Sequence, residues 1–341
     1  MLTLDGSHGE GGGQILRTAL SLAVRLGRPV ALENVRARRS KPGLQPQHLT
    51  TVRALARVSD AEVTGAALGS TAIAFVPHAL RAGSHRFDVG AERGSAGSVA
   101  LVLQALLLPL AAAAAPARLV LVGGTHVPWS PPVHYIADVF LPALRALGIE
   151  AEIVLRRWGW YPRGGGEVEA TVRPGAPRTL TLEHTDPGAP WTGVSAVSRL
   201  PRSIAERQRH RALERLAAAG VAAEIEVVED ASALGPGTLV FLAARGRAGF
   251  SALGRRGVPA EQIADEAVDA LLAHRASGAA VDTHLADQMV PFLALAPGES
   301  TFTCATISSH LATVAWVVEQ LLPVRIALEE GRPARVRVRP R

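Results

Sequence analysis

Short apolar segments of strand length alternate with longer amphipathic segments of helical period through the first half of the chain. Turn signals separate them, with Gly-Gly-Gly before the first helical segment and Pro-Gly before the second. The pattern predicts a strand, a helix, a strand, a helix and two further strands, at residues 2–5, 13–26, 29–35, 45–58, 61–65 and 71–76. This order is βαβαββ.

The same order then repeats. The second unit is predicted at residues 85–89, 97–112, 118–123, 131–147, 150–156 and 166–172. Equivalent helices of the two units begin about 84 and 86 residues apart, which indicates an internal duplication. A third unit begins with a strand at 178–183 and breaks off. Its remaining helix, strand, helix and two strands are predicted at residues 285–295, 300–305, 309–322, 324–329 and 334–339.

The fold predicted from this order is α/β. Because βαβ crossovers pack helices on one face of a sheet, each unit should form two layers. Residues 1–183 and 281–341 are expected to form a core of three βαβαββ repeats, with residues 184–280 as a small α/β domain inserted in the third.

The insertion has signals of its own. Ser203 and Glu206 predict a capping box that opens a helix ending at Ala219. Two strands are predicted at residues 223–228 and 237–244, and a second helix at 259–275. Turn-rich borders are predicted at residues 186–188 and 277–278.

The charge balance narrows the possible chemistry. A net charge of +6 favours a polyanionic partner. Of 36 basic residues only Lys41 is a lysine, and its neighbours Ser40 and Pro42 exclude a phosphate-binding P-loop. The neighbours of Lys41 also do not resemble the motif by which DNA ligases transfer a nucleotide through lysine. If a covalent nucleotide intermediate forms, histidine is therefore the expected carrier. Four arginines of the insertion could contact the phosphates of a polyanionic partner, but a solvated helix face is favoured. They are Arg202, Arg207, Arg209 and Arg211.

Other features bear on the cellular compartment. The first ten residues show no secretory signal pattern. The uncharged stretch 94–117 contains Gln104 and two prolines, which predicts a buried helix followed by a loop rather than a membrane span. A single cysteine, Cys304, excludes an intrachain disulfide and a multi-cysteine metal site. A cytoplasmic protein is expected.

The first candidate site is the glycine-rich segment from Asp5 to Gln14, between a strand and a helix. Its backbone N–H groups can approach phosphate at the positive end of the helix. Glu10 would face such a phosphate with Mg²⁺ between them, because Mg²⁺ commonly binds one or two carboxylates together with phosphate oxygens. A simple glycine-rich turn with a solvated glutamate is the alternative.

A second candidate is the basic cluster of Arg36, Arg38, Arg39 and Lys41 before the second helix. Four cations at a helix N-terminus suit a bound phosphate, because the helix dipole also favours an anion there. The alternative is a basic edge strand, in which Arg36 and Arg38 would share one face and Arg39 the other.

Further polar residues stand at equivalent junctions. Gln104 is isolated on an apolar helix and must find a partner in a ligand or in the neighbouring backbone. Pro128 could form an apolar wall for a base, and Asp287 and Gln288 could contact ribose or adenine. For Asp287, capping of the nearby helix start is the alternative, and the favoured one.

His310 stands at the start of the last predicted helix, the position in the third repeat that matches the arginine-bearing junction of the first. A helix N-terminus lowers the pKa of an imidazole, which would keep the neutral, nucleophilic form available. A structural histidine is the alternative.

Seven segments together resemble the RNA 3′-terminal phosphate cyclase family, in family order along nearly the whole chain. They are GEGGGQILRTALSLA, RARRSKPGLQPQHLT, GSAGSVALVLQALLLP, GGTHVPWSPP, WYPRGGGEV, HLADQMV and SSHLATVAWVVEQLLPV. The resemblance implies three βαβαββ repeats with a small domain inserted in the third, as the pattern predicts.

By that resemblance, His310 attacks the α-phosphorus of ATP and carries AMP, which passes to an RNA 3′-phosphate before the 2′-hydroxyl closes a 2′,3′-cyclic phosphate. Glu10 would bind Mg²⁺ or Mn²⁺. The residues implied around the reactive phosphates are Arg17, Arg36, Arg39 and Gln47. The implied nucleotide contacts are Gln104, Pro128, His284, Leu285, Ala286, Asp287 and Gln288.

Two features depart from the family pattern. His284 stands where bacterial relatives often have tyrosine, and the stretch 90–94 is longer than usual. The resemblance leaves two alternatives: a non-catalytic cyclase-like protein of ribosome assembly, and an enolpyruvyl transferase built from similar units. Labelling with ATP separates both from a cyclase, because neither forms an adenylate.

Overall fold

The computed structural model describes residues 1–91, 96–185 and 190–341. The first repeat consists of β1 (Leu2–Asp5), α1 (Gly13–Leu26), β2 (Val30–Glu33), α2 (Pro46–Ser59), β3 (Glu62–Thr64) and β4 (Ile73–Val76). The second consists of β5 (Gly83–Asp88), α3 (Val99–Leu110), β6 (Ala117–Gly123), a three-part helix, β7 (Ala151–Arg157) and β8 (Gly166–Val172). The third consists of β9 (Thr181–Leu182), α8 (Thr283–Leu293), β14 (Ser300–Cys304), α9 (Ser309–Leu321), β15 (Val324–Glu329) and β16 (Ala334–Pro340).

The three repeats share one sheet topology, which confirms the predicted duplication. Their strand orders are β1-β2-β4-β3, β5-β6-β8-β7 and β9-β14-β16-β15. In each sheet the first two strands of the repeat are parallel and the other pairings are antiparallel. The parallel pair requires a helical crossover, which α1, α3 and α8 supply.

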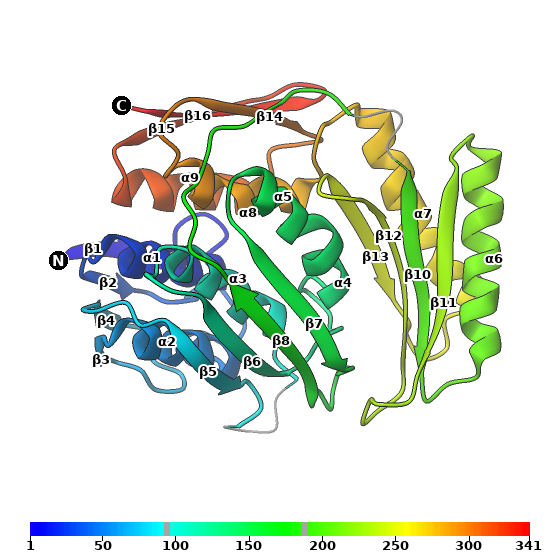
Figure 1. Ribbon diagram of the computed structural model, residues 1–341, viewed down its shortest axis with the longest axis horizontal. Helices are drawn as coiled ribbons and strands as arrows, with labels where there is room; N and C mark the ends of the chain where they lie inside the picture. Colours follow the sequence, from blue (N-terminus) through cyan, green and yellow to red (C-terminus); the bar gives the residue numbers. More distant parts are fainter. Residues whose placement is uncertain (92–95, 186–189) are drawn as a thin grey trace.

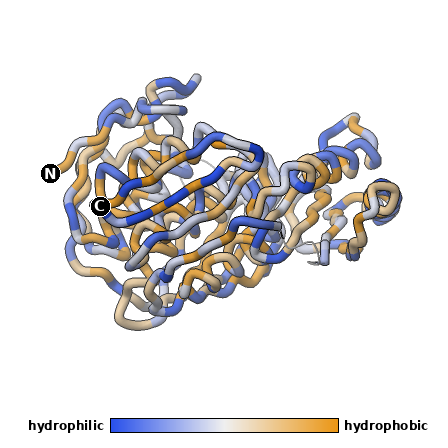
Figure 2. Tube along the Cα trace, turned by 90° about the horizontal axis from the view of Figure 1, so that it is seen from above, coloured by the Kyte–Doolittle hydropathy of each residue, from blue (hydrophilic) through white to orange (hydrophobic). Residues whose placement is uncertain are grey.

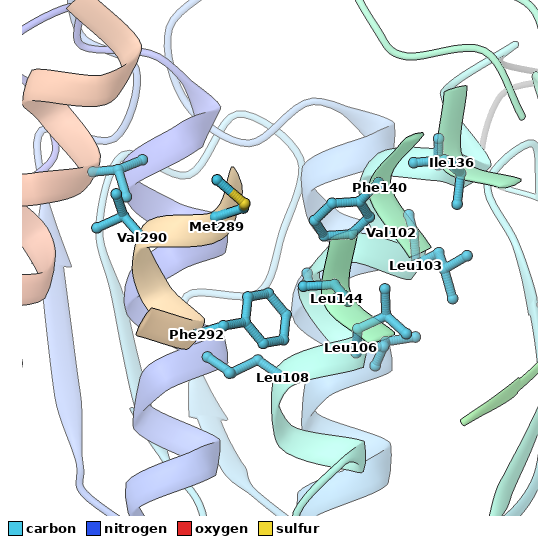
Figure 3. Close-up of a cluster of buried hydrophobic side chains, with 14 of the residues drawn as sticks. Val102, Leu103, Leu106, Leu108, Ile136, Phe140, Leu144, Met289, Val290 and Phe292 are labelled. Atoms are coloured by element: carbon cyan, nitrogen blue, oxygen red, sulfur yellow. The ribbon is translucent and has the colours of Figure 1, made fainter. Parts of the chain in front are cut away.

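The helices of the repeats converge between the three sheets (Figure 1). Helix α1 packs against α2, α3 and α9, and α8 packs against α9. Figure 3 shows the resulting core, where side chains of α3 meet those of α8 and of the segment containing Phe140. The rings of Phe140 and Phe292 lie edge to face with centroids 6.2 Å apart. Loops that precede these helices are thereby brought to one place.

The segment between β9 and α8 forms a separate sheet. It contains β10 (Trp191–Ser198), α6 (Arg202–Ala218), β11 (Ala223–Asp230), β12 (Gly237–Ala244), β13 (Ala248–Leu253) and α7 (Ala260–Ser277), with strand order β11-β10-β12-β13. It extends to one side of the repeats (Figure 1), and hydrophilic residues mark its helices (Figure 2). Strands β10 and β13 were not predicted. Small residues weaken the strand pattern of β10, where Gly193 is required because a Cβ would lie 2.5 Å from the Phe241 carbonyl oxygen.

Three further local expectations are wrong. No side chain caps α6, which follows Pro201, so Ser203 and Glu206 form no capping box. The helix predicted at 131–147 is divided into α4 (Val133–Tyr135), the π-helical η1 (Ile136–Phe140) and α5 (Leu141–Ala146). Strand β2 ends at Glu33 rather than at residue 35. The predicted border at 186–188 lies outside the described residues, as does most of the stretch 90–94.

The basic residues of α6 form ion pairs and a backbone contact within the insertion. Arg207 binds Glu261 through two bonds of 2.7 Å, and Arg211 lies 2.8 Å from Asp265. Arg202 pairs with Glu206, and Arg209 donates to a backbone carbonyl. These contacts favour the helix-face interpretation over RNA binding. Within the described ranges, no helix is both long and apolar enough to span a bilayer.

Candidate functional site

A pocket of about 800 Å³ lies where the helices of the three repeats converge. It is lined by eleven of the residues that the sequence singled out: Glu10, Arg17, Arg36, Arg39, Gln47, Gln104, Pro128, His284, Asp287, Gln288 and His310. Residues of β13 in the inserted segment complete one wall. Side chains far apart in the sequence thus share one cavity, as expected if duplicated units present their loops at equivalent edges.

Two candidate residues lie elsewhere. Leu285 and Ala286 are fully buried in the hydrophobic core and do not line the pocket. Helix α8 presents only one face to the cavity, so a run of five consecutive residues cannot all point into it. His284, Asp287 and Gln288 occupy that face.

His310 lies in the first turn of α9, with its side chain 47% exposed. Ser308 caps this helix by accepting a hydrogen bond from the backbone N–H of Leu311. The Nε2 atom of His310 lies 2.8 Å from Oε2 of Glu10, and Nη2 of Arg39 lies 2.6 Å from Oε1 of the same carboxylate. Glu10 therefore bridges an imidazole and a guanidinium at the edge of the pocket.

The contact with Glu10 shifts the pKa of His310 in the direction opposite to the one predicted from the sequence. The hydrogen bond that His310 donates to Glu10 raises the pKa of His310, against the effect of burial, and the charges of Glu10 and Asp287 add to the rise. The lowering predicted from the helix N-terminus is wrong, because a carboxylate in direct contact outweighs the partial charge of a helix end. Burial opposes ionisation of Glu10, but His310 and Arg39 together lower its pKa.

The glycine-rich loop that carries Glu10 is docked on α9. The ring of His8 stacks on Trp316 with centroids 3.9 Å apart. Gly9 adopts φ +56, and a Cβ there would lie 2.4 Å from Oγ1 of Thr313. Since Thr313 stands one turn after His310, these contacts fix the distance between Glu10 and His310.

Replacing Gly9 with alanine is therefore expected to slow any reaction that uses His310 and to lower thermal stability by an amount equivalent to about 1–2 kcal/mol or more. The left-handed backbone and the Thr313 hydroxyl both oppose a Cβ. Thermal denaturation and single-turnover kinetics measure the two effects.

A matched control separates them. Gly27 has φ +61 with open space around it, so Gly27→Ala reports backbone strain alone. Adding Thr313→Ala to Gly9→Ala should restore part of the rate, because it removes the clashing oxygen. Equal effects of Gly9→Ala and Gly27→Ala on rate and stability would contradict this role of the loop.

The basic cluster forms a turn, not an edge strand. Arg36 has φ +57 and donates from Nη1 to the carbonyl oxygens of Lys41 and Gly43, at 2.7 and 3.0 Å. Arg38 donates to the carbonyl of Gly9. Arg36 and Arg38 thus organise two loops, while Arg39 contacts Glu10. Burial, with repulsion from Arg39, lowers the pKa of Arg36.

Two further polar side chains of the pocket, those of Gln14 and His48, have no role predicted from the sequence. Gln14 accepts a hydrogen bond from Arg17 at 2.5 Å and donates one to Asp287 at 3.1 Å, so it links the first repeat to the third. His48 accepts a bond from the backbone N–H of Gln45. Burial and the charges of neighbouring arginines lower the pKa of His48 to about 3. The sequence gives one indication of a role for Gln14 and His48, because each lies at the start of a predicted helix, directly after a candidate loop.

Burial also lowers the pKa of Arg17 to about 10, although Asp287 and Glu10 oppose this. Gln47 accepts a hydrogen bond of 2.9 Å from the backbone N–H of Ser98, which joins the first repeat to the start of α3. Its amide nitrogen is the group left for a ligand.

Asp287 is not a helix cap. Asp282 caps α8 by accepting hydrogen bonds from the N–H groups of His284 and Leu285. Asp287 lies one turn later, and burial raises its pKa to about 7 despite the positive charges of His310 and Arg17. Keeping a carboxylate in such a position costs stability, which indicates a function in the site.

Asp287→Asn is expected to stabilise the ligand-free protein. The raised pKa means that the folded state holds a proton that the unfolded chain loses above about pH 4, so stability falls as pH rises toward 7. The gain from asparagine should therefore be small near pH 4–5 and reach its full size above pH 7. Thermal denaturation of both proteins at pH 5 and pH 8 tests this, and a gain independent of pH would contradict it.

Two buried amide atoms in the pocket have no hydrogen-bond partner among the described residues. They are Nε2 of Gln104, a donor, and Oε1 of Gln288, an acceptor. Buried polar groups are nearly always hydrogen-bonded in native proteins, so these atoms point to a ligand that supplies both partners.

The protein is thus an α/β protein built from three repeats that converge on one cationic pocket. A histidine and a glutamate are in contact at the edge of this pocket, which is suited to anionic ligands. The family model described as RNA 3′-terminal phosphate cyclase matches residues 8–328. The chain belongs to the RNA 3′-terminal phosphate cyclase family, which is a family of enzymes.

Individual relatives agree with this family. A protein of Methylococcus capsulatus named RNA 3′-terminal phosphate cyclase is 50% identical over 349 residues, covering 99% of this chain and 96% of the relative. A protein of the same name from Pyrobaculum neutrophilum is 45% identical, covering 97% and 95%. Among solved structures, the enolpyruvyl transferase NikO from Streptomyces tendae is 17% identical with a TM-score of 0.29, covering 51% of this chain and 33% of that chain. A likeness this weak gives no support to the enolpyruvyl transferase alternative.

Proposed function

We propose that this enzyme converts the 3′-terminal phosphate of RNA to a 2′,3′-cyclic phosphate with ATP, through AMP carried on His310. The observation that carries the proposal is the exposed imidazole of His310 at a pocket that also holds Arg17, Arg36 and Arg39. An RNA-processing role accords with the cytoplasmic location expected from the sequence.

The nucleotide would bind with its base toward the two partnerless amides. Adenine carries an amino donor and ring-nitrogen acceptors, which complement Oε1 of Gln288 and Nε2 of Gln104. Pro128 and His284 are exposed on the rim, where they can cover the faces of the base. The ring of His284 supplies a smaller stacking surface than tyrosine would.

The phosphates would lie against the arginines and the glycine-rich loop. Arg17 and Arg39 already contact side chains of the site, so their guanidinium groups are held in place before a ligand arrives. Fixed cations of this kind stabilise the charge that develops as a phosphoryl group is transferred. Backbone N–H groups at the start of α1 add a further anion-binding element.

The proposed chemistry begins at Nε2 of His310, the ring atom that faces Glu10. Loss of the Nε2 proton to Glu10 leaves a lone pair at that atom, which attacks the α-phosphorus and expels pyrophosphate. The RNA 3′-phosphate oxygen then displaces His310 and takes AMP. Finally the neighbouring 2′-hydroxyl attacks the activated phosphorus, AMP leaves and the hydroxyl proton is released. Activation is needed because a phosphate monoester has no good leaving group.

The pocket residues would hold Mg²⁺ or Mn²⁺ only if the ion bound Glu10 together with phosphate oxygens of the ligand. No group of three or more His, Cys, Asp or Glu side chains able to hold a metal occurs among the described residues. Such an ion would neutralise phosphate charge. Glu10 and Arg39 would orient the phosphates beside it.

A direct assay tests the proposal. Incubation with ATP, Mg²⁺ and an oligoribonucleotide ending in a 3′-phosphate should give a product whose terminal phosphate resists phosphatase. Acid opening of the ring to a monoester should make that phosphate sensitive to phosphatase again. An oligoribonucleotide with a 3′-hydroxyl should remain unchanged. If the RNA binds but its phosphate stays sensitive under all conditions, the non-catalytic alternative is favoured.

A further inference from the structure

The loop between β6 and α4 carries the most exposed large apolar side chain of the described residues. Trp129 is 96% exposed and lies among the residues that line the pocket of His310. The other four tryptophans of the chain are buried or half-buried. An indole left entirely in water costs free energy, so its place at this pocket requires an explanation.

The base of this loop is rigid. Oγ1 of Thr125 lies 2.7 Å from Nδ1 of His126, and Nε2 of His126 lies 2.9 Å from Nδ1 of His134. The ring of His126 also stacks on Trp158 with centroids 4.3 Å apart. Burial lowers the pKa of both histidines, so neutral rings maintain this contact at ordinary pH.

The tip of the loop is constrained as well. Trp129 adopts φ +59, a conformation that residues with side chains rarely take, between Pro128 and the pair Pro131 and Pro132. The Ser130 hydroxyl donates to the carbonyl of Val127 and closes the turn. These constraints hold the backbone of Trp129 in place and leave its indole outside the core and beside the pocket.

We propose that Trp129 is a stacking platform for a nucleobase at the 3′ end of the RNA substrate, an inference that rests on the proposed function. Single-stranded RNA is commonly bound by aromatic side chains on which unstacked bases lie. An exposed indole on a constrained loop, beside a pocket proposed to bind RNA ends, fits this use. Stacking does not depend on base identity, as a general end-processing enzyme requires.

The geometry favours an RNA base over the adenine of ATP. The partnerless amides of Gln104 and Gln288 are buried, so a base read by them lies inside the pocket. A base on Trp129 would instead remain at the surface. That position suits a strand that continues outward into solvent.

Trp129→Ala is expected to raise the KM for 3′-phosphate RNA about ten-fold, the effect of losing one stacked base. The rate of AMP transfer to the protein from ATP without RNA should stay the same. Tyr161→Ala is a matched control, because Tyr161 is 65% exposed but does not line the pocket. It should leave both quantities unchanged, and Trp129→Phe should lose less than alanine.

An RNA whose terminal nucleotides are abasic should bind the native enzyme as weakly as intact RNA binds the Trp129→Ala variant. Combining the abasic RNA with the variant should weaken binding no further. An unchanged KM in Trp129→Ala would overturn the platform. A slower AMP transfer with an unchanged KM would assign the indole to ATP instead and also overturn it.

Fluorescence separates this proposal from the proposed function. RNA should quench the emission of the native protein, and Trp129→Phe should abolish most of the quenching. Quenching without any cyclic product would retain the platform and reject the cyclase chemistry. Normal cyclisation without quenching would reject the platform and retain the cyclase chemistry.

Discussion

Replacing His310 with alanine is expected to eliminate AMP transfer from ATP to the protein and to reduce cyclisation by about 10³-fold or more, as for removal of a nucleophile elsewhere. The ring is half-exposed at the start of α9, so the fold should persist. Labelled ATP followed by denaturing electrophoresis measures the adduct, which should be labile in acid and stable in alkali.

The chain offers a matched control for this variant. His78 is another exposed histidine in contact with a glutamate, Glu62, at 3.4 Å, and it lies outside the pocket. His78→Ala should retain the full adduct. A labelled adduct that survives in His310→Ala would place the nucleophile elsewhere and contradict the mechanism.

The second large effect is expected from Glu10→Gln. Glutamine keeps the size of the side chain but cannot take the Nε2 proton or pair with Arg39, so the rate of AMP transfer should fall about 10²-fold. Because Glu10 raises the pKa of His310, its removal should also shift the pH dependence.

The direction of that shift follows from the ion pair. Neutral His310 is the reactive form, so the native rate should rise with pH through a midpoint above the ordinary histidine value of about 6.5. In Glu10→Gln the midpoint should move to lower pH. The pair with Glu10 likewise stabilises the folded state below about pH 6.5, and this stabilisation is lost as pH rises through the raised pKa.

Single-turnover AMP transfer measured from pH 5.5 to 9 tests both expectations, with Glu62→Gln as the control because its partner His78 lies outside the site. A midpoint that does not move, together with an undiminished rate, would remove Glu10 from the chemistry.

The repeats could be predicted because duplication leaves the same periodic pattern three times, and because turn residues mark each junction. The inserted sheet was harder. Its central strand β10 contains Gly193, Ser195 and Ala196, small residues that lack the β-branched pattern of a buried strand. The π-helical turn at Ile136–Phe140 leaves no mark that periodicity distinguishes from an α-helix.

Most pocket residues were also predictable, because loops at equivalent junctions of duplicated units must converge. Two features of the site were not predictable from the sequence. The resemblance implies nucleotide contacts along the whole run from His284 to Gln288, although a helix turns Leu285 and Ala286 into the core. The pKa of His310 depends on Glu10, which reaches it only through the tertiary fold, whereas the helix end is visible locally.

In the proposed mechanism a single imidazole, that of His310, carries AMP. Incubation of the native enzyme with ATP and Mg²⁺, digestion under alkaline conditions and mass spectrometry of the peptides test it directly. The peptide containing His310 should gain the mass of AMP, and it should lose this mass when 3′-phosphate RNA is supplied. An adduct on Lys41 or on another histidine would contradict this mechanism.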